Sequence, residues 1–136
     1  FKASLSHTLV FNHTSIQYAG DSEVDRLAFD SGYTIPKDKS TLSIGFERDK
    51  YSLTFTGIRL GKIANYAEDA YLPESYIVNA NFTWDIAEAA TLSLSIDNLL
   101  DEAPVKDDTQ SSYPYYNSNW YDSIGRSYYL ELKYKF

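Results

Sequence analysis

The chain has 136 residues and a net charge of −7, and its 13 Tyr, 7 Phe and 2 Trp make it too aromatic for a disordered tail. The acidic balance argues against a protein that binds nucleic-acid backbones, because such a protein needs a basic patch for the phosphates. The absence of Cys excludes a disulfide framework and a thiolate site, and it leaves the compartment open.

Neither a targeting segment nor a membrane-spanning helix is predicted. Residues 1–6 lack the charged start, the apolar run and the small-residue cleavage site of a signal peptide. No stretch approaches the roughly 20 apolar residues of a spanning helix, and the mean hydropathy is −0.40. These observations exclude helical membrane proteins only, because the alternating strands of a β-barrel average to a similarly modest hydropathy.

The first half of the chain alternates apolar and polar side chains, as a strand does when successive side chains point to opposite faces. Residues 1–14 form the first predicted strand. Residues 17–39 break the alternation with Gly and Pro and are predicted to be a long loop, in which residues 21–29 favour a helical turn. Residues 40–47 and 51–62 then form a predicted hairpin around a tight polar turn.

The second half of the chain repeats this arrangement. Residues 64–75 are predicted to be a second long loop, and residues 76–85 and 91–98 a second hairpin with a short connection. Residues 99–123 form the third and longest predicted loop, and the final strand follows it. One side of that final strand carries the apolar residues Tyr128, Leu130, Leu132, Tyr134 and Phe136.

The predicted fold is all-β: an antiparallel transmembrane β-barrel segment of six long strands. Globular strands have about five to six residues, whereas these approach the length of about nine to eleven residues that crosses a membrane at a tilt. Short connections alternate strictly with long ones, which is typical of outer-membrane barrels with short periplasmic turns and long extracellular loops. The alternative is a soluble, carbohydrate-binding β-sandwich, in which the same apolar residues would cover a core.

Motifs near the end of the chain add a resemblance to a known family. The segment Ser95-Ile96-Asp97-Asn98-Leu99-Leu100-Asp101-Glu102 resembles the end of the penultimate strand in TonB-dependent outer-membrane receptors. Residues 121–126, and the path from Gly125 to a terminal Phe136, are similar to the approach and last strand of that family. Residues 34–39 are similar to a recurring strand entry in the same family. The chain departs from the family pattern at Leu100, where Phe is more usual, and at Ala103-Pro104, where Tyr is.

The resemblance implies that residues 1–136 are the C-terminal part of such a barrel, in the outer membrane of a Gram-negative bacterium. Receptors of this family bind an external nutrient, such as a sugar, a peptide or a metal chelate, for uptake energised by TonB. The implied partners are outer-membrane lipid, the remainder of the barrel and its plug, the TonB system acting through that plug, and the barrel-assembly machinery. No plug domain or TonB box is recognised in these residues.

Catalytic and metal-binding chemistry is weakly represented in the sequence. The only imidazole bases are His7 and His13, which share the parity of apolar residues. His7 is predicted to be a wall position near the lipid face, and His13 has no Ser or Asp at an informative spacing. We therefore predict no enzyme activity and no cofactor, and we keep an outer-membrane hydrolase as a third hypothesis.

The third loop also carries possible oxygen ligands for Ca²⁺, which are Asp101, Glu102, Asp107 and Asp108. Their spacing matches no calcium-loop motif, and we predict a solvated acidic loop with no metal.

The third loop places aromatic side chains beside amide side chains. Such rings can stack on a sugar or peptide, because each ring buries a large area at little entropic cost. They can equally pack the loop onto its neighbours. The candidate ligand contacts are Tyr113, Tyr115, Tyr116, Trp120 and Tyr121. By resemblance to outer-membrane proteins, the alternating end of the chain is also the signal read by the assembly machinery, formed by Tyr128, Leu130, Leu132, Tyr134 and Phe136.

Overall fold

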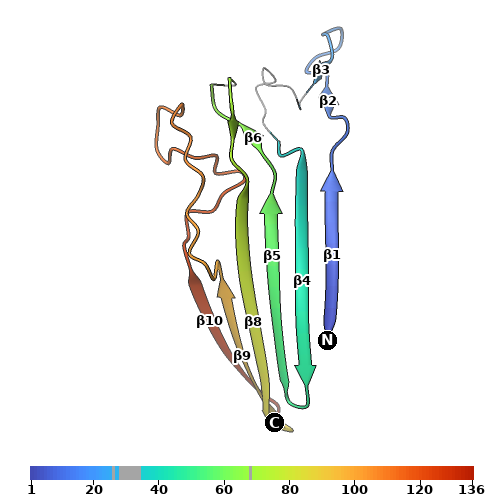
Figure 1. The fold of residues 1–136 in the computed structure, drawn as a ribbon, viewed down its shortest axis with the longest axis vertical. Helices are drawn as coiled ribbons and strands as arrows, with labels where there is room; N and C mark the ends of the chain where they lie inside the picture. Colours follow the sequence, from blue (N-terminus) through green and yellow to red (C-terminus); the bar gives the residue numbers. More distant parts are fainter. Residues whose placement is uncertain (26, 28–34, 68) are drawn as a thin grey trace.

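A computed structural model describes residues 1–25, 27, 35–67 and 69–136. Six strands form one antiparallel sheet in which each strand pairs with its neighbours along the chain (Figure 1). The prediction of six antiparallel strands is therefore confirmed. In sheet order the strands are β1 (Lys2–Leu9), β4 (Asp38–Arg48), β5 (Tyr51–Leu60), β8 (Ser75–Ala87), β9 (Ala90–Asp97) and β10 (Ser127–Tyr134).

The connections alternate as predicted: β4–β5 and β8–β9 are joined by tight turns, and the other connections are long. Asp49, at the tip of the first turn, has a φ of 52°. Asp tolerates this left-handed conformation better than most residues do, which explains why the polar turn lies there. The two-stranded ribbons in the loops were not predicted. They are β2 (Thr14–Ser15) with β3 (Val24–Asp25), and β6 (Ile63–Ala64) with β7 (Tyr71–Leu72).

Two expectations for the N-terminal region are wrong. The first strand ends at Leu9 instead of continuing to residue 14. Val10, which interrupts the alternation, donates its N–H to the Lys37 carbonyl at 2.8 Å, and the chain then leaves the sheet. The helical turn expected over residues 21–29 is replaced at Val24–Asp25 by a strand, and residues 26, 28 and 29 lie outside the described part of the chain.

The register separates the side chains of the sheet onto two faces. We call one the apolar face; a representative row across the strands is Ala3, Ile44, Phe55, Ala80, Ile96 and Tyr128. We call the other the polar face; its rows include Ser4, Ser43, Thr56 and Asn79, and further along Asn81, Ser95 and Tyr129. Alternation along each strand thus becomes a two-sided wall.

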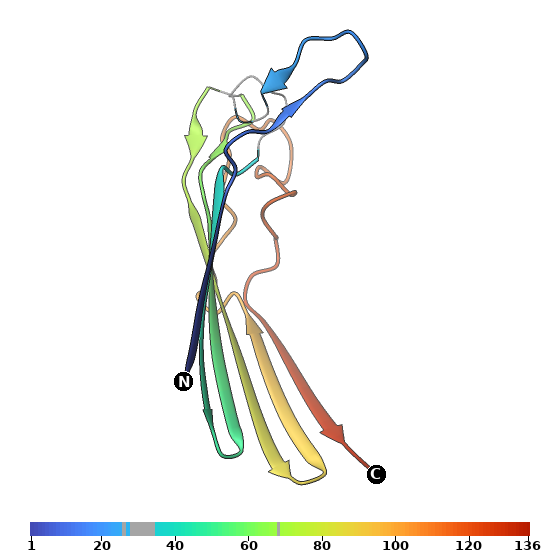
Figure 2. The same ribbon diagram turned by 90° about the vertical axis from the view of Figure 1, so that its right-hand side faces the viewer.

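The only hydrophobic core cluster of the described residues lies among the loops. It consists of Leu60 at the end of β5, Ile63, Leu72 and Tyr121, with Val105 and Tyr116 packed against it. Figure 2 shows the sheet as one curved layer, with the third loop folded over one side of its upper end. Among the described residues, the only other sheet that packs near this layer is the two-stranded β6–β7 ribbon, at the end of β5, so the two-sheet core of a β-sandwich is not formed there.

Candidate functional site

The apolar face carries large exposed side chains on β4, β5 and β10, including Phe46 at 49%, Phe55 at 41% and Leu130 at 67%. On the central strands β8 and β9, side chains such as Phe82 and Leu94 are partly exposed. A soluble monomer rarely leaves a contiguous apolar patch of this kind uncovered, so the face is a candidate surface for contact with lipid or a partner.

The edge of the apolar face near the tight turns is aromatic. Tyr51 stacks on Trp84 with ring centroids 5.9 Å apart and on Phe82 at 6.2 Å. Tyr134 meets Phe136 edge to face at 5.1 Å. The predicted assembly-signal residues Tyr128, Leu130, Leu132 and Tyr134 lie on this face of β10 and are exposed, and Phe136 follows the end of the strand. Aromatic rings with a polar edge are typical of a membrane–water interface.

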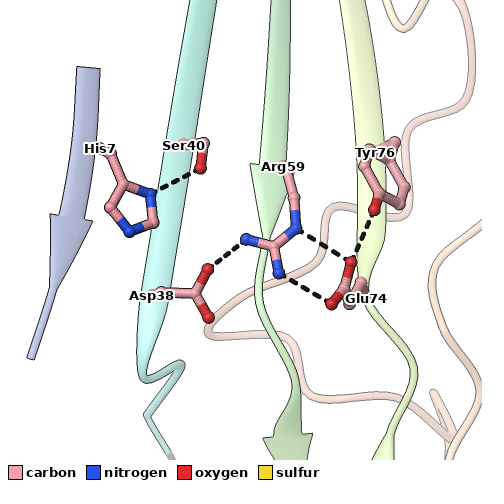
Figure 3. Close-up of polar contacts among 6 residues, drawn as sticks. All are labelled: His7, Asp38, Ser40, Arg59, Glu74 and Tyr76. Atoms are coloured by element: carbon pink, nitrogen blue, oxygen red, sulfur yellow. Dashed lines mark hydrogen bonds and ion pairs between the residues drawn. The ribbon is translucent and has the colours of Figure 1, made fainter. Parts of the chain in front are cut away.

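The opposite edge of the apolar face is polar, a feature that sequence reasoning missed. Four strands each contribute one side chain to a row in register: His7, Ser40, Arg59 and Tyr76. Figure 3 shows Arg59 at the centre of this row, between the carboxylates of Asp38 and Glu74. Arg59 donates two hydrogen bonds to Glu74, at 2.8 and 2.9 Å, and is also ion-paired with Asp38.

Two further contacts complete this polar row. The Tyr76 hydroxyl donates to Glu74 at 2.6 Å, and His7 Nδ1 lies 2.8 Å from the Ser40 hydroxyl. Hydrogen bonds from Arg59, and then from Tyr76, lower the pKa of Glu74 from 4.5 to about 2. Glu74 therefore stays ionised at neutral pH, and Arg59 is held between two carboxylates.

A signal for the polar row was present in the sequence. The turn at Asp49–Lys50 fixes the register of β4 against β5, so Arg59 has to lie opposite Ser40. Asp38, two residues before Ser40 on the same face, is then diagonal to Arg59. Arg59 also shares the parity of Tyr51 and Phe55. Extending the predicted hairpin to its open end, residue by residue, would have placed a charge on the apolar side.

The two motifs that carry the family resemblance contact each other in space. We call Asn98, Asp101, Gly125 and Arg126 the loop clasp, because they join the two ends of the third loop. Buried Asn98 pairs with the backbone of Glu102 in both directions, at 2.8 and 2.9 Å, and its own N–H donates to Asn79.

Asp101 then closes the clasp. Its Oδ1 accepts the Arg126 N–H at 2.8 Å, just before β10 begins. A Cβ at Gly125 would lie 2.8 Å from the same oxygen, so a side chain there would push the Asp101 carboxylate away from this position. Asn98 and Asp101 have φ values of 51° and 59°, a conformation that Asn and Asp tolerate. The clasp explains physically why these residue types occur together at this spacing.

Asp107, one of the candidate Ca²⁺ ligands, instead joins the third loop to the second. It is buried, and its Oδ2 accepts the Tyr66 N–H at 2.6 Å. Its Oδ1 accepts from the N–H and hydroxyl of Thr109, and the same hydroxyl accepts the Ala67 N–H. Both carboxylate oxygens are therefore engaged within the protein. Among the described residues, no group of three or more His, Cys, Asp or Glu side chains is arranged to hold a metal ion.

The five aromatic candidates of the third loop separate into three environments. Tyr113 and Tyr115 are exposed and meet edge to face at 6.4 Å. Tyr116 and Tyr121 belong to or pack against the core among the loops. Burial raises the pKa of the Tyr121 hydroxyl; nearby Ser75 opposes this shift without reaching hydrogen-bond geometry. Trp120 lines a hollow beneath the loop.

That hollow lies between the upper end of the polar face and the third loop, and its volume is about 430 Å³. Its floor is formed by Ile58, Leu60 and Ile77 from β5 and β8. The loop contributes Trp120, Tyr121, Ile124 and Pro104, and carboxylates lie around it at Asp97, Glu102 and Asp122. The size and the mixture of apolar floor with a few polar groups suit a small-molecule site.

Within the described part of the chain there is no helix of the length and apolarity needed to cross a membrane. Comparison with family models finds no match, and searches among curated proteins and solved structures likewise match none.

Proposed function

We propose that this chain is a segment of an outer-membrane β-barrel, the C-terminal wall of a TonB-dependent receptor that takes up an external nutrient. The observation that carries the proposal is the exposed apolar face, bounded by an aromatic edge on one side and a polar row on the other. Lipid is the partner that such a band fits, with its polar borders in the two interfaces.

The dimensions of the band support this proposal. From Tyr51 in the aromatic edge to Arg59 in the polar row, β5 advances eight residues, which is about 26 Å at about 3.3 Å per residue. At a tilt of roughly 40° this length corresponds to about 20 Å across the membrane, against about 25 Å for the apolar band of outer-membrane barrels. The long loops then belong to the external side and the tight turns to the periplasm.

The open edges of the sheet require more strands in this proposal. β1 and β10 have one unpaired edge each among the described residues. Unpaired backbone groups in hydrocarbon cost several kcal/mol each, and the smallest barrels have about eight strands. The remainder of the barrel therefore has to pair with both edges. Its plug and the TonB motor follow from the family resemblance and would act outside these residues.

The structure offers no specific support for the two alternatives. A carbohydrate-binding sandwich needs a second sheet to cover the apolar face. A hydrolase needs a base aimed at a nucleophile. His7 does face a hydroxyl, that of Ser40, but this pair is exposed on the apolar face and lies outside the hollow beneath the third loop. Among the described residues, no third group hydrogen-bonds to His7 to orient it as a catalytic base.

The membrane assignment is tested on the complete protein that carries this segment. We expect it to stay with outer membranes through a urea wash, to dissolve in detergent, and to run faster on an unheated gel than after boiling. A cooperative thermal transition of the 136-residue chain alone in detergent-free buffer would overturn the proposal.

The transport assignment predicts that cells lacking this protein and cells lacking TonB share a growth defect on one sugar, peptide or metal chelate. Growth defects on different nutrients would refute the transport assignment.

A further inference from the structure

The polar face changes character beneath the third loop. Over most of its length this face carries Ser, Thr and Asn side chains, among them Ser43, Thr56 and Asn81. Ile58 and Ile77, which are partners in register, replace them at the floor of the hollow. Both remain partly exposed, so the loop has not covered them. An aliphatic floor left open on an otherwise polar wall is suited to the apolar body of a ligand.

The charges around this floor are mostly negative. Asp97 and Glu102 have no hydrogen-bond or ion-pair partner for their carboxylates among the described residues, while Asp122 accepts the Ile124 N–H. Lys39 is the one cationic residue in the lining, on the far strand β4. Tyr121 adds a buried hydroxyl without a hydrogen-bond partner in the described residues. Unpaired carboxylates beside an apolar surface favour a cation and disfavour an anion.

We propose that the hollow binds a compact organic cation, with its aromatic or aliphatic body on Ile58 and Ile77 and its ammonium group facing Asp97 and Glu102. The hollow of about 430 Å³ has room for a body of one or two rings. This inference rests on the proposed function, because the hollow opens toward the inner side of the barrel, and it narrows the nutrient to a cationic amphiphile.

Three indole compounds with the same two-carbon linker test this charge preference: tryptamine, tryptophol and indole-3-propionate. They carry an ammonium, a hydroxyl and a carboxylate group, respectively, on the same body. Each is titrated into the complete detergent-folded barrel and followed by saturation-transfer NMR. We expect tryptamine to bind about tenfold more tightly than indole-3-propionate, with tryptophol between them. Equal binding of the ammonium and carboxylate compounds, or no saturable binding of any, would overturn the inference.

Variants then locate the binding. Combined Asp97→Asn and Glu102→Gln should weaken tryptamine about tenfold and change tryptophol less than about twofold. Ile77→Ser should weaken both compounds. Asp85→Asn, on the same face but near a tight turn, is the matched control and should change neither. Tryptamine binding that survives the double variant would refute the site.

The gel assay on the same samples separates the two proposals. A barrel that folds in detergent yet binds none of the compounds refutes only the inference about the hollow. A protein that never acquires the heat-sensitive folded band contradicts the membrane assignment itself. Each variant is compared only in preparations in which this band is present.

Discussion

The wall of the sheet and the loops above it have opposite distributions of apolar surface. In the wall, the regular part of the structure, large apolar side chains such as Leu5, Phe55 and Leu132 are exposed. In the loops, the irregular part, Ile63, Leu72 and Tyr121 are buried in a small core. A soluble protein has its core under its regular elements, so this inversion indicates that the wall relies on a surrounding medium or partner for cover while the loops hold themselves together.

The comparison also separates the interactions that hold each region. The wall depends on ladder hydrogen bonds and on the environment of its two faces, because no second layer packs on it among the described residues. The loops depend on buried polar side chains, of which Asn98 and Asp107 make the most specific contacts. Under the proposed function, changes in the wall should therefore affect membrane insertion, whereas changes in the loops should affect local order.

The largest expected effect comes from placing a charge in the middle of the apolar face. Leu94→Arg puts a cation between Phe82 and Leu130, and should cost about 2–4 kcal/mol of folding free energy in a bilayer. Ser93→Arg, one residue away on the polar face and opposite Glu131, should have little effect. Urea titration of the complete barrel in liposomes measures both. Equal losses would contradict the assignment of the two faces.

The loop clasp should give the next largest effect. Asn98→Ala removes two hydrogen bonds and leaves a left-handed backbone conformation without the side chain that tolerates it, at a cost of about 2–3 kcal/mol. Asn98→Gly should recover the part of this free-energy loss that comes from the left-handed backbone conformation. Asn119→Ala, at an exposed position of the same loop, is the control. Urea midpoints in detergent compare the three, and no difference between Asn98→Ala and Asn119→Ala would refute the role of the clasp.

The contact between the second and third loops should have a smaller and more local effect. Asp107→Asn weakens the hydrogen bonds that this side chain accepts from the Tyr66 and Thr109 N–H groups. The change should lower the free energy of unfolding by about 1–2 kcal/mol. We expect faster amide exchange at Tyr66 with no change in the strands. Asp108→Asn is the matched control, because residue 108 is exposed. Unchanged exchange in Asp107→Asn would show that the loops dock without this carboxylate.

The smallest expected effect is the pH dependence of stability that comes from Glu74, at the border between the wall and the loops. The folded-state pKa of Glu74 is lowered from 4.5 to about 2, so its stabilising contribution is present above about pH 4.5 and is lost as the pH falls toward 2. The thermal midpoint of the wild type should drop more over this range than that of Glu74→Gln. Parallel curves for the two proteins would contradict the pairing of Glu74 with Arg59.

The sequence by itself determined the strands, their antiparallel order and the two faces, because side-chain alternation has a fixed period of two and tight turns set the register. It also marked the segments that hold the clasp residues, through their resemblance to motifs of a known family, and the structure supplies the backbone conformations that favour Asn and Asp there. The tertiary structure alone decided where the first strand leaves the sheet, that Arg59 also pairs with Glu74, and which loop aromatics are buried. These outcomes depend on contacts between segments far apart in sequence, such as Tyr66 with Asp107, whose spacing in the chain carries no periodic signal.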